Sequence, residues 1–66
     1  MFAVLTTSRG KYTINLAKVL FFYEYKKGTR VEMEDGTIID VEESVYDLQF
    51  TLSVFDAIPH ISALKN

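Results

Sequence analysis

Residues 19–25, VLFFYEY, restrict the fold of this sequence more than any other stretch. Six of these seven residues are aromatic, leucine or valine, and such residues favour β-strands. Alternate side chains of a strand point to opposite faces, and here both faces are apolar. One face carries Val19, Phe21, Tyr23 and Tyr25, and the other carries Leu20 and Phe22. Because a strand that is apolar on both faces is typical of the interior of a covered sheet, we expect 19–25 to be the central strand.

Turn residues divide the neighbouring sequence into four more strands. Gly10, Gly28 and the dipeptide Asp35-Gly36 mark the turns, and Asp-Gly is suited to a type I′ hairpin turn. The expected strands are 2–7, 12–15, 29–34 and 37–42. In the last two strands, the inward-facing residues are Thr29, Val31, Met33, Thr37, Ile39 and Val41, whereas Ile38 points outward.

Residues 44–55 fit two kinds of secondary structure. The apolar residues Leu48, Phe50, Leu52 and Val54 alternate with polar ones, as in a strand. Ser44 followed by Asp47 instead resembles a capping box, which is typical of a helix N-terminus. Pro59 would end such a helix near Ile58. We interpret the segment as a helix because of the capping signal.

A helix over this segment has two apolar stripes, one lying on the sheet and one pointing away from it. The inner stripe consists of Val45, Leu48, Leu52 and Phe55, and the outer stripe of Tyr46, Phe50, Val54 and Ala57. The predicted fold class is therefore α+β, mainly β: a five-stranded antiparallel meander with one C-terminal helix. It forms one small domain over residues 1–58, followed by a tail at 59–66.

The chain carries more apolar surface than one small domain can bury. A domain of about this length buries only about 60% of the surface that its unfolded chain exposes, and 48% of these residues are hydrophobic. Once the helix covers one face of the sheet, the residues without a partner in the chain are Leu20, Phe22, Ile38, Tyr46, Phe50 and Val54. A patch of that size is unusual on a monomer, so these residues are predicted to form the interface of a homo-oligomer, most simply a two-fold dimer. The alternative is that the five strands curl around a tight core and cover both faces within one chain.

The composition disfavours several classes of protein. The absence of cysteine excludes disulfides, thiolate zinc sites and cysteine nucleophiles, and is common in a reducing compartment. The longest apolar run, 19–23, is far shorter than the roughly 20 residues of a membrane span. Residues 1–5 lack the basic region and the length of a signal peptide. We expect a cytoplasmic protein without a membrane span.

Candidates for catalysis and metal binding are few. His60 has no carboxylate at a useful spacing, and Ser44 is explained by its capping role. The acidic residues between 32 and 43 lack the ligand spacing of a calcium loop and fit a solvated strand face. The prediction is therefore no enzyme activity, no catalytic residue, no metal and no cofactor.

Basic residues gather at the expected turns. The first and third turns of a meander lie at one end of the sheet, and the residues there are Arg9, Lys11, Lys26 and Lys27, with Arg30 close by. Neighbouring tyrosines make a phosphate-contacting or base-stacking edge the alternative function, that of a small transcriptional or nucleic-acid-binding protein. A formal net charge of −2 and nearby glutamates disfavour a nucleic-acid partner, and exposed lysines in turns are the simpler explanation.

Residues 8–55 resemble the small flagellar FlbD/SwrD family. The resemblance rests on Gly10-Lys11-x-x-Ile14-Asn15, on Val19-Leu20-Phe21-Phe22, on the Asp35-Gly36 hairpin and on Ile39-Asp40-Val41-Glu42-Glu43-Ser44-Val45. It implies a cytoplasmic bacterial accessory protein of flagellar function or swarming, without catalytic activity. The C-terminal helix of that family is typically charged, whereas residues 46–55 here are apolar and aromatic, so the resemblance does not extend to a shared partner.

A weaker similarity links residues 14–52 to the first half of the LytTR DNA-binding domain. The basic, histidine-containing segment that contacts DNA in that domain has no counterpart in this sequence. The sequence therefore predicts a small non-enzymatic protein-interaction or regulatory module that self-associates, with nucleic-acid binding as the alternative.

Overall fold

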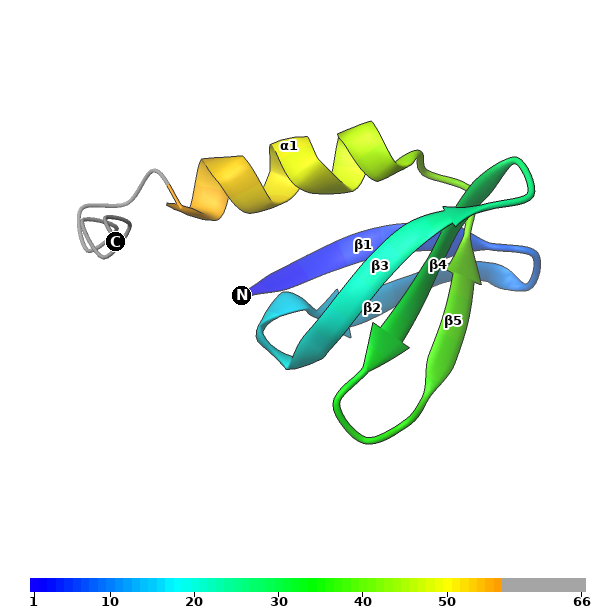
Figure 1. Ribbon diagram of the computed structural model, residues 1–66, viewed down its shortest axis with the longest axis horizontal. Helices are drawn as coiled ribbons and strands as arrows, with labels where there is room; N and C mark the ends of the chain where they lie inside the picture. Colours follow the sequence, from blue (N-terminus) through cyan, green and yellow to red (C-terminus); the bar gives the residue numbers. More distant parts are fainter. Residues whose placement is uncertain (57–66) are drawn as a thin grey trace.

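The chain folds into five antiparallel strands followed by one helix. The computed structural model describes residues 1–56 (Figure 1). The elements are β1 (Phe2–Thr7), β2 (Gly10–Asn15), the 3-10 helix η1 (Leu16–Lys18), β3 (Val19–Tyr25), β4 (Gly28–Met33), β5 (Ile38–Val41) and α1 (Val45–Asp56). The predicted class, α+β and mainly β with a C-terminal helix, is confirmed. The expected helix end near Ile58 and the tail at 59–66 lie outside the described residues.

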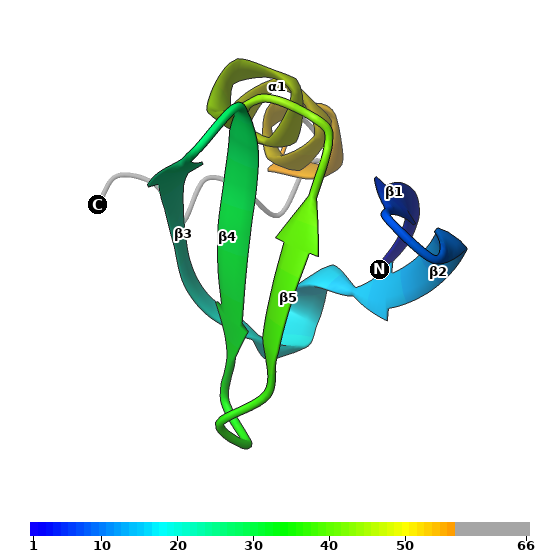
Figure 2. The ribbon, with the colours of Figure 1, turned by 90° about the vertical axis from the view of Figure 1, so that its right-hand side faces the viewer.

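The five strands are divided between two sheets, where one meander was expected. β1 pairs with β2, and the second sheet has the order β3-β4-β5. The break falls at η1, where the Asn15 side chain accepts a hydrogen bond from the Ala17 backbone N–H (3.0 Å) and Leu16 is buried. Because this turn redirects the chain, β3 lies at an edge of its sheet and not at the centre (Figure 2).

A bulge in β3 changes which of its side chains face the core. The pairing with β4 shifts between Val19 and Phe21, so Leu20 is an extra residue. Val19 and Phe22 therefore both pack against the core, while Phe21 and Tyr23 are exposed. The prediction that Phe22 faces outward with Leu20 is thus wrong, because the simple alternation from which it came ends at the bulge.

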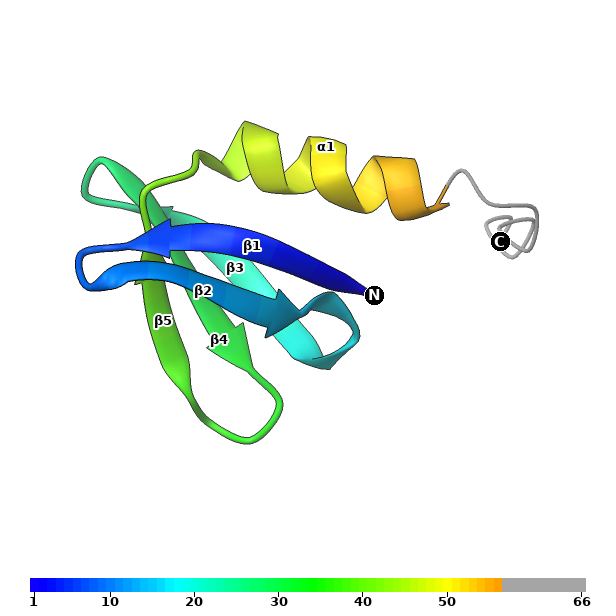
Figure 3. The same cartoon turned by 180° about the vertical axis from the view of Figure 1, so that it is seen from behind.

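The core lies between the three-stranded sheet, the β1–β2 hairpin and α1. Its buried residues come from each of these elements: Leu5, Ile14, Val31, Val41 and Leu48. α1 lies over one end of the three-stranded sheet, where it contacts β3 (Figures 2 and 3). Leu48, from the predicted inner stripe, is only 2% exposed, and Val45 and Leu52 of the same stripe are half-buried, so this side of the helix faces the core.

The helix begins with the predicted capping box. The Ser44 backbone N–H donates to the Asp47 carboxylate, and the Asp47 backbone N–H donates to the Ser44 hydroxyl, both at 3.1 Å. These reciprocal bonds satisfy donors that the first helical turn leaves without partners. The helical interpretation of this segment is therefore confirmed over the strand.

The hairpin at Asp35-Gly36 is not a type I′ turn. Gly36 has a φ of 93°, and Asp35 is not among the residues with positive φ, whereas type I′ needs positive φ at both central positions. The Gly36 N–H donates to the Met33 carbonyl (3.0 Å), and the Met33 N–H donates to the Thr37 carbonyl (2.8 Å). Hydrogen bonding by the Thr37 side chain, and by the Thr37 backbone N–H to the Asp35 carboxylate (2.9 Å), holds the pKa of Asp35 below its usual value. The Asp-Gly signal therefore located the hairpin but not its turn type.

The segment between β5 and α1 joins the two sheets. The Glu42 N–H donates to the Thr6 carbonyl at 2.8 Å, so β1 lies beside the end of β5. The Glu43 carboxylate accepts the backbone N–H of Thr6 (2.8 Å) and the Thr6 hydroxyl (2.9 Å). The buried Thr29 hydroxyl donates to the Glu43 carbonyl at 2.7 Å. Glu43 thus holds the N-terminal hairpin, the second sheet and the start of α1 together.

Candidate protein interfaces

The outer face of the three-stranded sheet carries exposed apolar side chains. Leu20 and Phe21 project from β3 and Ile38 projects from β5, each about half exposed. The strand register places Phe21, Glu32 and Ile38 in one row across the sheet. The rings of Phe21 and Tyr23 follow one another along β3, with centroids 6.0 Å apart. The apolar side chains of β3 and β5 thus flank Glu32 of β4 on this face, and we call the face the outer sheet surface.

Charged groups on the outer sheet surface are paired with their neighbours. The Arg30 guanidinium binds the Asp40 carboxylate with two hydrogen bonds (2.7 and 2.9 Å), and its carbon lies 3.7 Å from the centre of the Tyr25 ring. This contact with Arg30 lowers the pKa of Asp40. The Tyr23 hydroxyl donates to Glu32 at 2.7 Å, which raises the pKa of Tyr23. The Arg30 and Asp40 charges cancel, whereas Glu32 is bonded to a neutral hydroxyl, so these groups leave the surface with one net negative charge.

The outer stripe of α1 forms a second apolar surface. Tyr46, Phe50 and Val54 are 80%, 69% and 54% exposed, respectively. They lie on the side of the helix away from Leu48, which is buried against the core. The predicted interface residues therefore divide into two separate surfaces, with Leu20 and Ile38 on the outer sheet surface and the helix residues on the far side of α1. Phe22 belongs to neither.

Several exposed apolar residues were not expected from the sequence. Phe21 and Tyr23 were assigned to the covered face of β3, and the bulge at Leu20 is the reason that they are exposed. Phe2 and Val4, on β1, are 62% and 58% exposed. The sequence of the short strand 2–7 gave no indication that these two side chains would be exposed. A bulge has no reliable sequence signature in a run of uniformly apolar residues, so pattern alone could not locate these side chains.

A groove of about 430 Å³ runs between β3 and α1. Its lining includes Phe22, Tyr23 and Glu24 from the strand and Tyr46 and Gln49 from the helix. Within the described residues, β3 pairs only with β4, so this groove borders a free strand edge. The free edge of β3 and the beginning of the helix surface are therefore neighbours.

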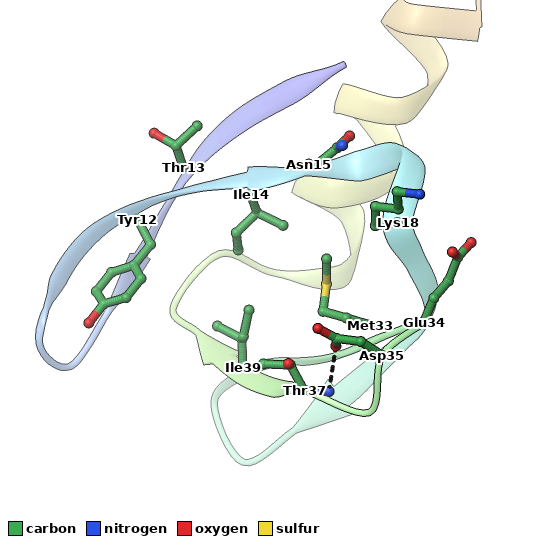
Figure 4. A pocket seen from close by; sticks show the side chains of 10 residues that line it. All are labelled: Tyr12, Thr13, Ile14, Asn15, Lys18, Met33, Glu34, Asp35, Thr37 and Ile39. Atoms are coloured by element: carbon green, nitrogen blue, oxygen red, sulfur yellow. Dashed lines mark hydrogen bonds between the residues drawn. The ribbon is translucent and has the colours of Figure 1, made fainter.

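A wider groove of about 590 Å³ lies between the two hairpins (Figure 4). Ile14 from β2 points toward Met33 and Ile39 from the second sheet, and Lys18 and Glu34 lie at one end. The carboxylate of Asp35, also in the lining, is already bonded to Thr37. The groove can therefore take an apolar group between its aliphatic side chains, with the charged side chains of Lys18 and Glu34 at one end.

The predicted basic residues share one end of the molecule. The β1–β2 turn and the β3–β4 turn both lie there (Figure 1), and Ser8 lines a hollow together with Lys26 and Lys27. Asp40 and Glu42 line the same hollow, and Arg30 is paired with Asp40. The remaining predicted contacts are Arg9, which is exposed in the first turn, and Lys11, whose ammonium group donates to the Thr6 hydroxyl at 3.2 Å. Positive and negative groups are interleaved at this end, which does not favour a polyanion.

Residues 1–56 show neither a group of metal-ligating side chains nor a membrane-spanning helix. This part of the chain brings together no group of three or more His, Asp or Glu side chains that could hold a metal ion. None of its helices has the length and apolar character to cross a bilayer. His60 lies outside the described residues.

The likeness to known proteins was tested in three ways. Comparison with family models, with curated protein sequences and with solved structures gives no match for this chain.

Proposed function

We propose that this chain is a small non-enzymatic interaction module that self-associates and acts through its two apolar surfaces. The observation that carries the proposal is the exposure of Tyr46 and Phe50 on a helix whose opposite side is already buried. A helix that is hydrophobic on both sides is typically enclosed on both sides. The outer sheet surface adds a second group of exposed apolar residues, and exposed apolar patches are typical of interaction sites.

The cellular role follows from the family resemblance alone. The similarity of residues 8–55 to the FlbD/SwrD family supports a role as a cytoplasmic accessory protein in bacterial flagellar function or swarming. A regulatory adaptor of this kind needs binding surfaces and no catalytic residues, which is consistent with the apolar character of the surfaces.

Phe50→Asp is expected to weaken the self-association of the chain, because the outer stripe of α1 is one of its two apolar surfaces. The substitution places a charge on the outer stripe of α1, where Phe50 is 69% exposed, so it should not disturb the core. Light scattering coupled to size-exclusion chromatography measures the mass, and circular dichroism checks the fold. Ser53→Asp is the matched control, because it adds the same charge at an exposed polar position of the same helix and should leave the mass unchanged.

Two outcomes would count against this assignment. If both aspartate variants kept the wild-type oligomer, the outer stripe of α1 would not be an interface. If Phe50→Asp unfolded the chain at a concentration where Ser53→Asp is folded, Phe50 would be a core residue rather than a surface one.

A further inference from the structure

We infer that the free edge of β3 pairs with β3 of a second copy, antiparallel about a two-fold axis at Phe22, so that two three-stranded sheets become one sheet of six strands. This inference rests on the proposed self-association and specifies its geometry. The partner is a second copy of this chain, and the outer sheet surfaces of both copies become continuous across the new strand pair.

The position of β3 in the fold conflicts with its sequence. Its composition is that of a central strand, yet within the described residues it pairs on one side only. Natural edge strands are usually blocked by proline, by lysine or by a covering segment. β3 has no proline or lysine and only one charge, at Glu24. The opposite edge of the same sheet is β5, and it is covered at its end. β1 lies beside the end of β5, where the Glu42 N–H donates to the Thr6 carbonyl.

Pairing with a second copy resolves this conflict. In a two-fold pair centred on Phe22, the strand acquires a neighbour on each side and becomes central, as its composition favours. The seven residues of β3 make it the longest strand of the fold, so it offers the longest row of unpaired backbone groups.

One register of the pair is preferred by the side chains. Centring on Phe22 sets Phe21 opposite Tyr23 of the second copy on the outer face, and aromatic cross-strand pairs of this kind are favourable. Centring on Tyr23 would instead set Phe21 against Tyr25, whose ring already contacts Arg30, and centring on Phe21 would set Tyr23 against Val19, which packs against the core.

The groove beside β3 provides the space that an added strand needs. It separates the strand from α1, and Tyr46, 80% exposed, stands over it next to Phe22 and Tyr23. The exposed parts of Leu20, Phe21, Tyr23 and Tyr46, together with the strand backbone, come to roughly 500 Å² per copy when an aromatic side chain is taken as about 200 Å². Because the outer sheet surface stays partly exposed, two copies would bury at most roughly 1,000 Å², at the lower limit for a specific interface, so a dissociation constant in the micromolar range is expected.

A mixing experiment tests the register directly. Phe21→Lys places an ammonium group beside Glu32 in its own chain, and Tyr23→Glu places a carboxylate beside Arg30, so both variants should fold. Each variant alone would set a charge against an aromatic ring across the interface and should associate about tenfold more weakly than wild type. In an equimolar mixture, one contact becomes Lys with Glu and the other stays Phe with Tyr, so a heterodimer should form at about wild-type strength. Sedimentation velocity with one variant fluorescently labelled measures it.

The outcomes separate this inference from the proposed function. Recovery in the mixture, with no recovery when either variant is mixed with Phe50→Asp, supports the strand pair. If both β3 variants associate like wild type while Phe50→Asp dissociates, self-association stands and the β3 edge is not its site. If the variants weaken association but the mixture does not recover it, the inferred register is wrong. A wild-type chain that stays monomeric overturns both proposals.

Discussion

Gly28→Ala is expected to destabilise the fold by about 3 kcal/mol, which is a large part of the stability of a domain this small. A β-carbon at this position would overlap the carbonyl oxygen of Val41 and would also lie 3.3 Å from the α-carbon of Glu42. Both neighbours are backbone atoms, so no side-chain rotation can relieve the overlap. The segment leading from β5 to α1 would have to move away, and with it the junction formed by Glu43. Urea denaturation followed by circular dichroism gives the free energy of unfolding.

Gly10→Ala is the matched control for this substitution. Gly10 has a φ of 119°, but a β-carbon there meets no atom within 4 Å. Its replacement should cost only the strain of positive φ, about 1 kcal/mol. If Gly10→Ala were as damaging as Gly28→Ala, close packing of the β5–α1 segment over β4 could not be the reason for glycine at position 28.

Glu43→Gln is expected to lower the free energy of unfolding by about 2 kcal/mol at neutral pH. The carboxylate accepts the backbone N–H and the hydroxyl of Thr6, and hydrogen bonds to a charged group are stronger than those to a neutral amide. The amide oxygen can keep the bond from the backbone N–H, and the NH₂ group can only donate to the Thr6 hydroxyl, so neither bond keeps the added strength that the negative charge gives. Glu42→Gln is the control, because the neighbouring side chain is exposed and makes no such contact, and it should change stability by less than about 0.5 kcal/mol.

The same carboxylate gives the fold a characteristic pH dependence. Partial burial raises the pKa of Glu43, but the hydrogen bonds from Thr6 and the charge of Lys11 outweigh it, so the pKa lies below its usual value of 4.5. The stabilisation is therefore fully present above about pH 4.5 and is lost as the pH falls through the lowered pKa. Stability measured between pH 7 and pH 3 should fall less steeply in Glu43→Gln than in Glu42→Gln. Parallel curves for the two variants would exclude Glu43 as the source.

Much of the fold could be predicted from local sequence signals. The turns at glycine, the alternation in β4 and β5 and the Ser44 capping box each depend on residues close together in the chain. The division into two sheets could not be predicted in this way, because it depends on how η1 packs Leu16 into a core assembled from distant segments. The bulge at Leu20 also could not be predicted from the sequence, because every residue around it is apolar and the alternation gives no signal.

The candidate interfaces were predicted less completely than the fold. Periodicity correctly identified Tyr46, Phe50 and Val54 as the exposed side of α1, because one helical turn fixes which side chains share a face. The sheet residues were harder, because one extra residue in a strand moves every later side chain to the other face. For this reason Phe22 faces the core and Phe21 is exposed, contrary to the prediction. The residues that were predicted to form one surface therefore lie on two.

Sedimentation equilibrium of the wild-type chain tests the central claim most directly. The monomer has a mass of 7.6 kDa, and a self-associating chain should show a mass that rises toward twice this value between about 1 and 100 µM. The account predicts this rise, with half-association in the micromolar range. A mass that stays at 7.6 kDa across the whole range would contradict it, and the exposed helix stripe and the free edge of β3 would then need a different partner.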